Sequence, residues 1–219
     1  MQEKGIDFFD VDHTLTKRSS GRHFILLGVK KKIFPPKVLV SLPYYYFYYR
    51  FGNLKLESIK QGYPILKGIP ISKLEALSRE SFAMKLKNDI YSDAVSLIKR
   101  LKEENRKIVL ATSSLDIIVK PLADFLEIDG IIATALETEN GLCTGALTDA
   151  PIFATEKKRK VLKYIDEMGS SPSECSFYSD SIHDLPLLQS VGNPVAVNPD
   201  PRLKRVARKN NWKIINFKK

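Results

Sequence analysis

The chain has 219 residues, of which 43% are hydrophobic and 27% are charged, and this balance excludes an intrinsically disordered protein. Its net charge of +10 is unevenly distributed: nine Lys or Arg residues and no acid lie between Lys17 and Lys55, and eight more, again without an acid, follow from Pro201. Such stretches favour anionic partners, namely a phosphorylated substrate, nucleic acid or an acidic membrane surface, although many are simply solvated surface.

Cysteine usage and the N-terminus point to the cytoplasm. Cys143 and Cys175 are far apart and have no metal-ligand spacing, which is typical of reduced thiols in a cytoplasmic protein. The N-terminal segment lacks the basic region and long apolar stretch of a signal peptide. The most apolar segment, 33–51, contains Lys37 and several prolines, so we expect no membrane-spanning helix.

The first predicted element is a buried strand that ends in two carboxylates. The apolar residues from Ile6 lead directly into Asp10, Val11 and Asp12, followed by Thr14. Two carboxylates so close together repel each other and are costly to bury, which indicates a functional reason for the pair.

Residues 17–88 have a different pattern, dense in apolar and aromatic residues and without strand alternation. We interpret them as an all-helical cap domain inserted after the first strand. Ser72 and Glu75 have the spacing of a capping box and predict the start of a helix. The predicted core domain then comprises residues 1–16 and 89–219.

From Asp89 onward, short apolar strands alternate with helical periods. Ala94, Leu97, Ile98 and Leu101 have helical spacing, and a second helix is predicted to end before Gly169. The sequence at 137–145 contains an Asn-Gly pair and predicts a hairpin. The predicted strands are 107–111, 130–133, 175–179, 194–198 and 213–217. This alternation predicts an α/β fold with a doubly wound parallel sheet.

Four polar clusters fall at strand ends or helix starts, where such sheets place their chemistry. They are Asp10 to Thr14, Thr112 to Ser114, Lys157 and Lys158, and Ser179 to Asp184. Together they can serve phosphoryl transfer. One carboxylate can act as the nucleophile, Mg²⁺ and a lysine can offset the negative charge, and a second carboxylate with a raised pKa can exchange protons.

The order of these clusters resembles the haloacid dehalogenase superfamily of phosphohydrolases, whose motifs are DxDxT, a Ser or Thr, a Lys and a pair of acids. The helical insertion after the first motif is similar to the branch that includes phosphoserine phosphatase. The resemblance implies Asp10 as nucleophile, Asp12 as general acid/base, and Thr112, with Ser113, as phosphate-binding residues. It implies Mg²⁺ as cofactor, held by Asp10, the carbonyl of Asp12 and Asp180, with Asp184 in support. For the lysine we prefer Lys158, and Lys157 stays open.

The substrate follows less clearly from the sequence. Phosphoserine phosphatases generally have a Glu shortly after the first motif, whereas this chain has Lys17, Arg18 and Arg22 there and no acid before Glu57. We therefore expect a small phosphorylated metabolite other than phosphoserine, contacted by Arg18 or Arg22. The alternatives are a phosphotransferase or mutase of the same superfamily, an aspartyl-phosphate receiver domain, and a protein that binds nucleic acid or an anionic membrane with a secondary phosphatase site. Nucleic acid is the less favoured partner, because no recognised motif is present, and the oligomeric state is not predicted.

Overall fold

The structure is a computed structural model that describes residues 5–40 and 62–218. Its centre is a six-stranded sheet in the order β3-β2-β1-β6-β7-β8, in which every neighbouring pair is parallel. The strands are β1 (Ile6–Phe9), β2 (Lys107–Leu115), β3 (Gly130–Thr134), β6 (Ser176–Ser179), β7 (Asn193–Val197) and β8 (Lys213–Ile215). The chain winds outward from β1 to β3 and then crosses to β6 on the other side of β1. The predicted doubly wound parallel sheet is confirmed.

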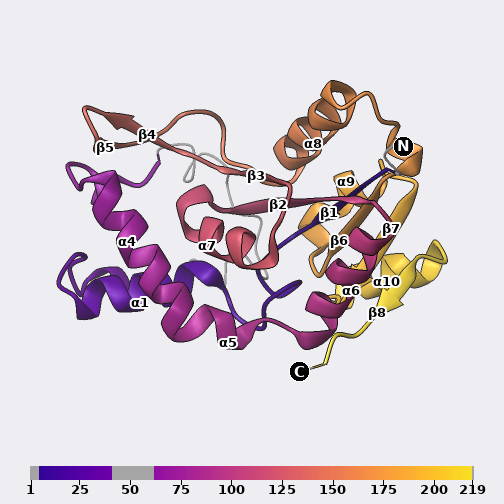
Figure 1. Cartoon of the computed structure of the whole chain (residues 1–219), viewed down its shortest axis with the longest axis horizontal. Helices are drawn as coiled ribbons and strands as arrows, with labels where there is room; N and C mark the ends of the chain where they lie inside the picture. Colours follow the sequence, from indigo (N-terminus) through magenta and orange to yellow (C-terminus); the bar gives the residue numbers. More distant parts are fainter. Residues whose placement is uncertain (1–4, 41–61, 219) are drawn as a thin grey trace.

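Helices cover both faces of this sheet (Figure 1). On one face, α8 (Thr155–Glu167), α9 (Leu185–Leu188) and α10 (Pro201–Lys209) pack on a core that contains Phe8 and Phe177. On the other face, α6 (Ser92–Glu103) and α7 (Asp116–Leu126) pack on a core that contains Phe9 and Leu110. Phe8 and Phe9 contribute to opposite faces because successive side chains of a strand alternate.

The insertion between β1 and α6 forms a separate helical layer at one end of the molecule (Figure 1). Its described elements are α1 (Ser20–Lys30), the single turn η1 (Pro64–Leu66), α4 (Ile71–Ser81), the π-helical turn η2 (Phe82–Leu86) and α5 (Lys87–Asp89). Phe24, Leu74 and Leu77 form a hydrophobic core that continues into Ile118 of α7. The insertion therefore packs against the end of the sheet domain.

A hairpin of the sheet domain extends this layer. Strands β4 (Leu136–Glu139) and β5 (Leu142–Leu147) are antiparallel and joined by a two-residue turn, as the Asn-Gly signal predicts. Gly68 donates to the Cys143 carbonyl (2.8 Å) and Cys143 donates to the Ile69 carbonyl (3.0 Å). These bonds fasten the segment before α4 to the hairpin. A pair of glycines, Gly62 and Gly145, allows the two backbones to come close, because a Cβ on Gly62 would lie 2.3 Å from the Gly145 oxygen.

The chain enters and leaves the insertion at one place. Lys17 donates its backbone N–H to the carbonyl of Asp89 (2.8 Å), and Tyr91 donates to the carbonyl of Leu15 (3.0 Å). The two segments therefore lie side by side, and the division of the chain at residues 16 and 89 stays a prediction. His23 of α1 forms a 2.7 Å hydrogen bond with the Asp89 carboxylate at the same connection.

The predicted strands and the helices around Ala94 and before Gly169 are confirmed, with shifts of a few residues at their ends. The prediction that a capping box at Ser72 and Glu75 starts a helix is wrong. Helix α4 begins at Ile71, one residue before Ser72, and its N-cap residue is Pro70, which offers no side-chain acceptor. None of the helices among residues 5–40 and 62–218 is long and apolar enough to span a bilayer.

Candidate active site

Asp10 directly follows β1 at the point where the strand order reverses. In doubly wound sheets, a crevice forms there, outside the carboxyl ends of the strands. The backbone N–H of Asp10 donates to the carbonyl of Tyr178 (2.9 Å). This bond extends the pairing of β1 with β6 by one residue beyond the end of β1. Asp180 follows β6 at the same edge, and Thr112 emerges there from β2, because Phe9 pairs with Leu110. Three of the predicted clusters therefore meet at this edge.

Lys157 is the lysine that reaches the carboxylates. Its Nζ lies 3.1 Å from Oδ1 of Asp10 and 2.8 Å from Oδ1 of Asp184, and its side chain is 1% exposed. Lys158, which the sequence analysis preferred, is half-buried and belongs to another side of α8, since consecutive helical residues are about 100° apart. The preference for Lys158 is thus corrected to Lys157.

The charges around Asp10 shift its proton affinity. The pKa of the Asp10 carboxyl is raised to about 7, mainly by burial and also by the negative charges of Asp184 and Asp12, against the opposing attraction of Lys157. The pKa of Lys157 is raised, because attraction to Asp10 and Asp184 outweighs the loss of solvation. The lysine is therefore a fixed positive charge between two carboxylates.

The loop after β6 is held by hydrogen bonds to the first motif and to its own residues. Thr14 accepts a bond from the N–H of Asp180 (3.0 Å) and donates to the Asp180 carboxylate (3.4 Å). Ser179 donates to Asp184 (2.6 Å), the carboxylate that also binds Lys157. All four side chains of this network, Thr14, Ser179, Asp180 and Asp184, are buried. The motif threonine thus orients the neighbouring acid.

Asp200 supports the same loop and was not predicted from the sequence. One oxygen of its carboxylate accepts bonds from Arg202 and Leu203 at the start of α10 (2.8 and 2.9 Å), and the other accepts from Ile182 (2.8 Å). Its own N–H donates to the carbonyl of Asp180 (2.8 Å). The only signal in the sequence was an Asp immediately before a helix that begins with proline, which predicts a cap but no contact with a distant loop.

Asp12 is half-exposed and directed toward the insertion. Its Oδ2 accepts hydrogen bonds from the hydroxyls of Ser19 (3.0 Å) and Ser114 (3.1 Å), and its Oδ1 accepts from the backbone N–H of Ser20 (2.8 Å). The tight loop after Asp10 is closed by the Val11 carbonyl, which accepts bonds from Leu15 and Thr16. Ser19 was not a candidate from sequence, and Ser114 was predicted only as a member of the Thr112 to Ser114 cluster. Its bond to Asp12 was not predicted, because it joins residues 102 positions apart.

The remaining candidates are placed less centrally. Thr112 is buried, and its hydroxyl accepts a bond from the N–H of Ser114 (3.2 Å). Ser113 is half-buried at the same strand end, where its carbonyl accepts from Thr134 (3.2 Å). Arg18 and Arg22 are exposed, and neither forms an ion pair with another described residue. The structure does not bring these two arginines into the carboxylate cluster.

The donor set fits a hard divalent cation. Asp10, Asp180 and Asp184 are buried carboxylates, whereas Lys157 is the one buried Lys or Arg in the described part of the chain. The cluster therefore carries excess negative charge that a cation would balance, and oxygen ligands suit Mg²⁺. Within residues 5–40 and 62–218, no three His, Cys, Asp or Glu side chains already converge as a metal site. The resemblance implies a ligand set of only two carboxylates and a backbone carbonyl, which does not require three such side chains to converge.

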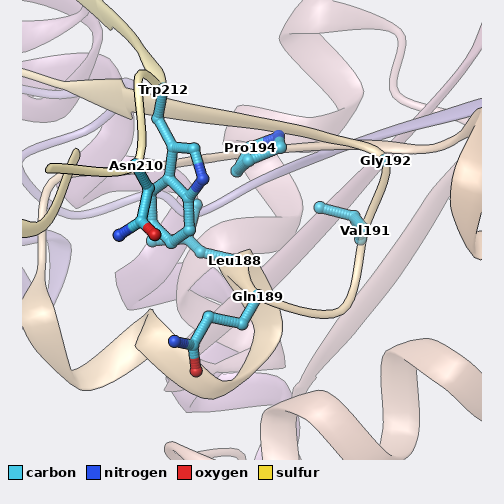
Figure 2. A pocket seen from close by; sticks show the side chains of 7 residues that line it. All are labelled: Leu188, Gln189, Val191, Gly192, Pro194, Asn210 and Trp212. Atoms are coloured by element: carbon cyan, nitrogen blue, oxygen red, sulfur yellow. The ribbon is translucent and has the colours of Figure 1, made fainter. Parts of the chain in front are cut away.

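A surface pocket lies away from this cluster. It is found at the amino-terminal ends of β7 and β8, opposite the edge where the carboxylates emerge. Figure 2 shows its lining residues, which are Leu188, Gln189, Val191, Gly192, Pro194, Asn210 and Trp212. None of them is ionisable, and the pocket contributes nothing to the candidate active site.

Comparison with known proteins bears on the family and the enzyme class. The model of the haloacid dehalogenase-like hydrolase family matches residues 8–189, which include all the site carboxylates. Phosphoserine phosphatase SerB1 of Mycobacterium tuberculosis is 28% identical over 218 residues, covering 96% of this chain and 70% of the relative. Histidinol-phosphatase of Neisseria meningitidis is 28% identical over 221 residues, covering 98% of this chain and all of the relative.

A solved structure described as a phospho-aspartyl intermediate analogue of phosphoserine phosphatase has the same fold, with a TM-score of 0.67 at 20% identity over 100% of this chain and 95% of that chain. The family match and the phosphatase relatives confirm the expected enzyme class, a phosphatase of this type. The chain belongs to the haloacid dehalogenase-like hydrolase family.

Proposed function

We propose that the protein is a Mg²⁺-dependent phosphomonoester hydrolase that acts through an aspartyl phosphate on Asp10. The observation that carries the proposal is the buried pairing of Asp10 with Lys157 at 3.1 Å, at the switch point of the sheet. The pKa of Asp10 is raised to about 7, mainly by burial, and a buried carboxyl with so strong a shift is typical of a functional site.

The reaction divides into two displacements. A carboxylate oxygen of Asp10 attacks phosphorus while the bond from phosphorus to the alcohol oxygen breaks, and Asp12 gives its proton to the departing oxygen. Water then attacks the phosphorus of the aspartyl phosphate, Asp12 takes the proton of that water, and Asp10 is released with inorganic phosphate. Lys157 stays charged throughout and offsets the negative charge on the transferred group.

Magnesium would be held by the side chains of Asp10 and Asp180 and the backbone carbonyl of Asp12. The ion supplies positive charge that balances the phosphate and the carboxylates when bound. Asp184 and Thr14 keep their places through the bonds to Lys157 and Asp180 described above. Thr112 and Ser113 would bind the phosphate oxygens, a role supported by their position in β2 beside the end of β1 that leads into Asp10.

The substrate we propose is a small phosphorylated metabolite that is neutral or anionic away from the phosphate, rather than phosphoserine. Lys17, Arg18 and Arg22 surround the start of α1, and no acid in this stretch is available for an ammonium group. The names of two relatives refer to different substrates, phosphoserine in one and histidinol phosphate in the other. Sequence similarity to these relatives therefore does not identify the substrate. The arginines are exposed and free to meet an anionic group.

Hydrolysis assays test the proposal directly. We expect rapid turnover of p-nitrophenyl phosphate with Mg²⁺, loss of turnover with EDTA, and loss in the variant Asp10→Asn. A panel of phosphorylated metabolites should then rank phosphoserine below polyol or nucleotide monophosphates in kcat/KM. Phosphoserine as the best substrate would refute the substrate class, and full activity of Asp10→Asn would refute the mechanism. A long-lived phosphoprotein without turnover would instead indicate a receiver domain.

A further inference from the structure

Asp12 is bound by donors from two separate parts of the chain. Ser19 and Ser20 stand at the start of α1, which belongs to the insertion, whereas Ser114 lies in β2 of the sheet. Ser19 and Ser114 both donate to the same oxygen, Oδ2, at 3.0 and 3.1 Å, and the N–H of Ser20 donates to Oδ1 at 2.8 Å. Both oxygens of Asp12 are therefore held.

Two further observations separate this arrangement from ordinary surface hydrogen bonding. The hydroxyls of Ser20 and Ser114 lie 3.1 Å apart, which closes the contact between α1 and β2 beside Asp12. Ser19 is the N-cap residue of α1, where a serine usually bonds to the first turn of its own helix. Its hydroxyl makes no such bond and goes to Asp12 instead. Helix α1 therefore has no side-chain N-cap bond, and the Ser19 hydroxyl is a donor to the Asp12 carboxylate.

We infer that Ser19, Ser20 and Ser114 are positioning residues that orient Asp12 for proton transfer, and that they make this orientation depend on the docking of α1 against β2. The inference rests on the proposed function, in which Asp12 is the general acid/base. Without the contact between the start of α1 and β2, Asp12 would lose the bonds that fix its direction.

Serine hydroxyls suit this task because each can donate to Oδ2 in both forms of Asp12, the carboxylate and the carboxylic acid. Asp12 alternates between these forms as it gives a proton to the alcohol and takes one from water. With Oδ2 bound by both hydroxyls, the exchanged proton is carried by Oδ1, on the lone pair that the N–H of Ser20 leaves unoccupied. Misplacing a catalytic group by about 1 Å can cost about 100-fold in rate.

The test compares two phosphomonoesters whose leaving groups differ in their need for a proton. p-Nitrophenolate departs without one, whereas the alkoxide of glycerol phosphate requires it. Since kcat/KM reports the steps up to transfer onto Asp10, Ser19→Ala and Ser114→Ala should lower kcat/KM for glycerol phosphate about tenfold or more. The value for p-nitrophenyl phosphate should change less than threefold, and the inhibition constant of inorganic phosphate should stay the same. Ser114→Thr, which keeps a hydroxyl, should recover most of the loss.

Ser78→Ala is the matched control. Ser78 is a buried serine of the insertion that also bonds across to the sheet domain, at the Ile118 carbonyl, but does not contact Asp12. An equal loss for both esters, or the same loss in Ser78→Ala, would overturn the positioning role in favour of general loosening. Asp12→Asn should show the same preference for the nitrophenyl ester. If the wild type hydrolyses both esters and the serine variants have the same kcat/KM values as the wild type, the inference fails and the proposed function stands. If the wild type hydrolyses neither ester, the proposed function fails and the inference fails with it.

Discussion

Lys157 is the positive charge paired with two of the active-site carboxylates, and its neighbour Lys158 provides a matched control. Among the described residues, Lys157 is the only ion-pair partner of Asp10 and Asp184, so Lys157→Met leaves two buried carboxylates uncompensated. We expect kcat/KM for p-nitrophenyl phosphate to fall at least 100-fold, and the free energy of unfolding to fall by roughly 3–5 kcal/mol, the usual cost of breaking a buried ion pair. Steady-state kinetics and urea titration measure the two effects.

Lys158→Met should differ from the wild type by less than twofold in rate, because that side chain contacts neither carboxylate. A larger loss in Lys158→Met than in Lys157→Met would restore the original preference for Lys158 and contradict the geometry. The pair of variants changes the same residue type within one helical turn, so helix propensity cancels in the comparison.

The raised pKa of Asp10 predicts a pH-dependent stability in the absence of divalent cations. The folded protein holds the Asp10 proton up to about pH 7, whereas the unfolded chain releases it near the ordinary aspartate pKa of 3.8. Stability from this group is therefore fully present below pH 3.8 and is lost as pH rises through 7. Asp10→Asn, which cannot ionise, should gain on the wild type by roughly 2–4 kcal/mol between pH 4 and 8.

Urea unfolding of both proteins in EDTA at several pH values measures this difference, and the comparison removes contributions from all other groups. Mg²⁺ should flatten the wild-type curve, because a bound cation favours the ionised carboxylate. A constant gap between the two proteins across the whole pH range would show that Asp10 titrates normally in the fold.

Among the elements, α10 and the loop after β6 are joined through Asp200. Asp200→Ala removes a helix cap and leaves the N–H of Ile182 without its acceptor, which together should cost roughly 2–4 kcal/mol of stability. Asp200→Asn keeps one oxygen for α10 but presents an amide N–H₂ to Ile182. We therefore expect Asn to recover most of the stability but not the activity, which depends on the loop that carries Asp180 and Asp184.

Thermal unfolding and p-nitrophenyl phosphate kinetics at limiting Mg²⁺ separate these two effects. Asp166→Ala, at an exposed position of α8, serves as the control and should change the free energy of unfolding by less than about 0.5 kcal/mol. Equal activity of Asp200→Asn and wild type would mean that the Ile182 contact does not matter for the site.

How far the sequence predicts these elements depends on the range of the interactions that form them. The parallel strands and the hairpin follow from apolar runs and from Asn140 and Gly141, whose positive φ values suit the turn. The residue at which α8 begins cannot be predicted in this way. The helix starts after Ala154, and the φ of 46° at this alanine has no signal in the sequence. That start decides whether Lys157 or Lys158 faces Asp10. The contacts of Asp200 and of the serines around Asp12 also depend on tertiary packing that local patterns do not contain.

For the whole molecule, the hairpin β4–β5 and the insertion should unfold as one unit although they are distant in sequence. Their shared core contains Leu74 and Cys143, and four backbone hydrogen bonds connect 62–71 with 141–145. Local opening generally follows such cooperative units. Disrupting one side of this contact should therefore expose both sides to exchange while the central sheet stays protected.

Two glycines allow a controlled test of this prediction. Gly62 and Gly68 have φ values of +75° and +77°, so alanine at either position costs a similar conformational strain of about 1–2 kcal/mol. Only at Gly62 would the new Cβ collide with the hairpin, 2.3 Å from the Gly145 oxygen, while at Gly68 it meets nothing within 4 Å. In hydrogen exchange with mass spectrometry, Gly62→Ala should speed exchange in 62–81 and 136–147 together. Gly68→Ala should do so much less, and faster exchange in 62–81 alone would show that the hairpin is stable without the insertion.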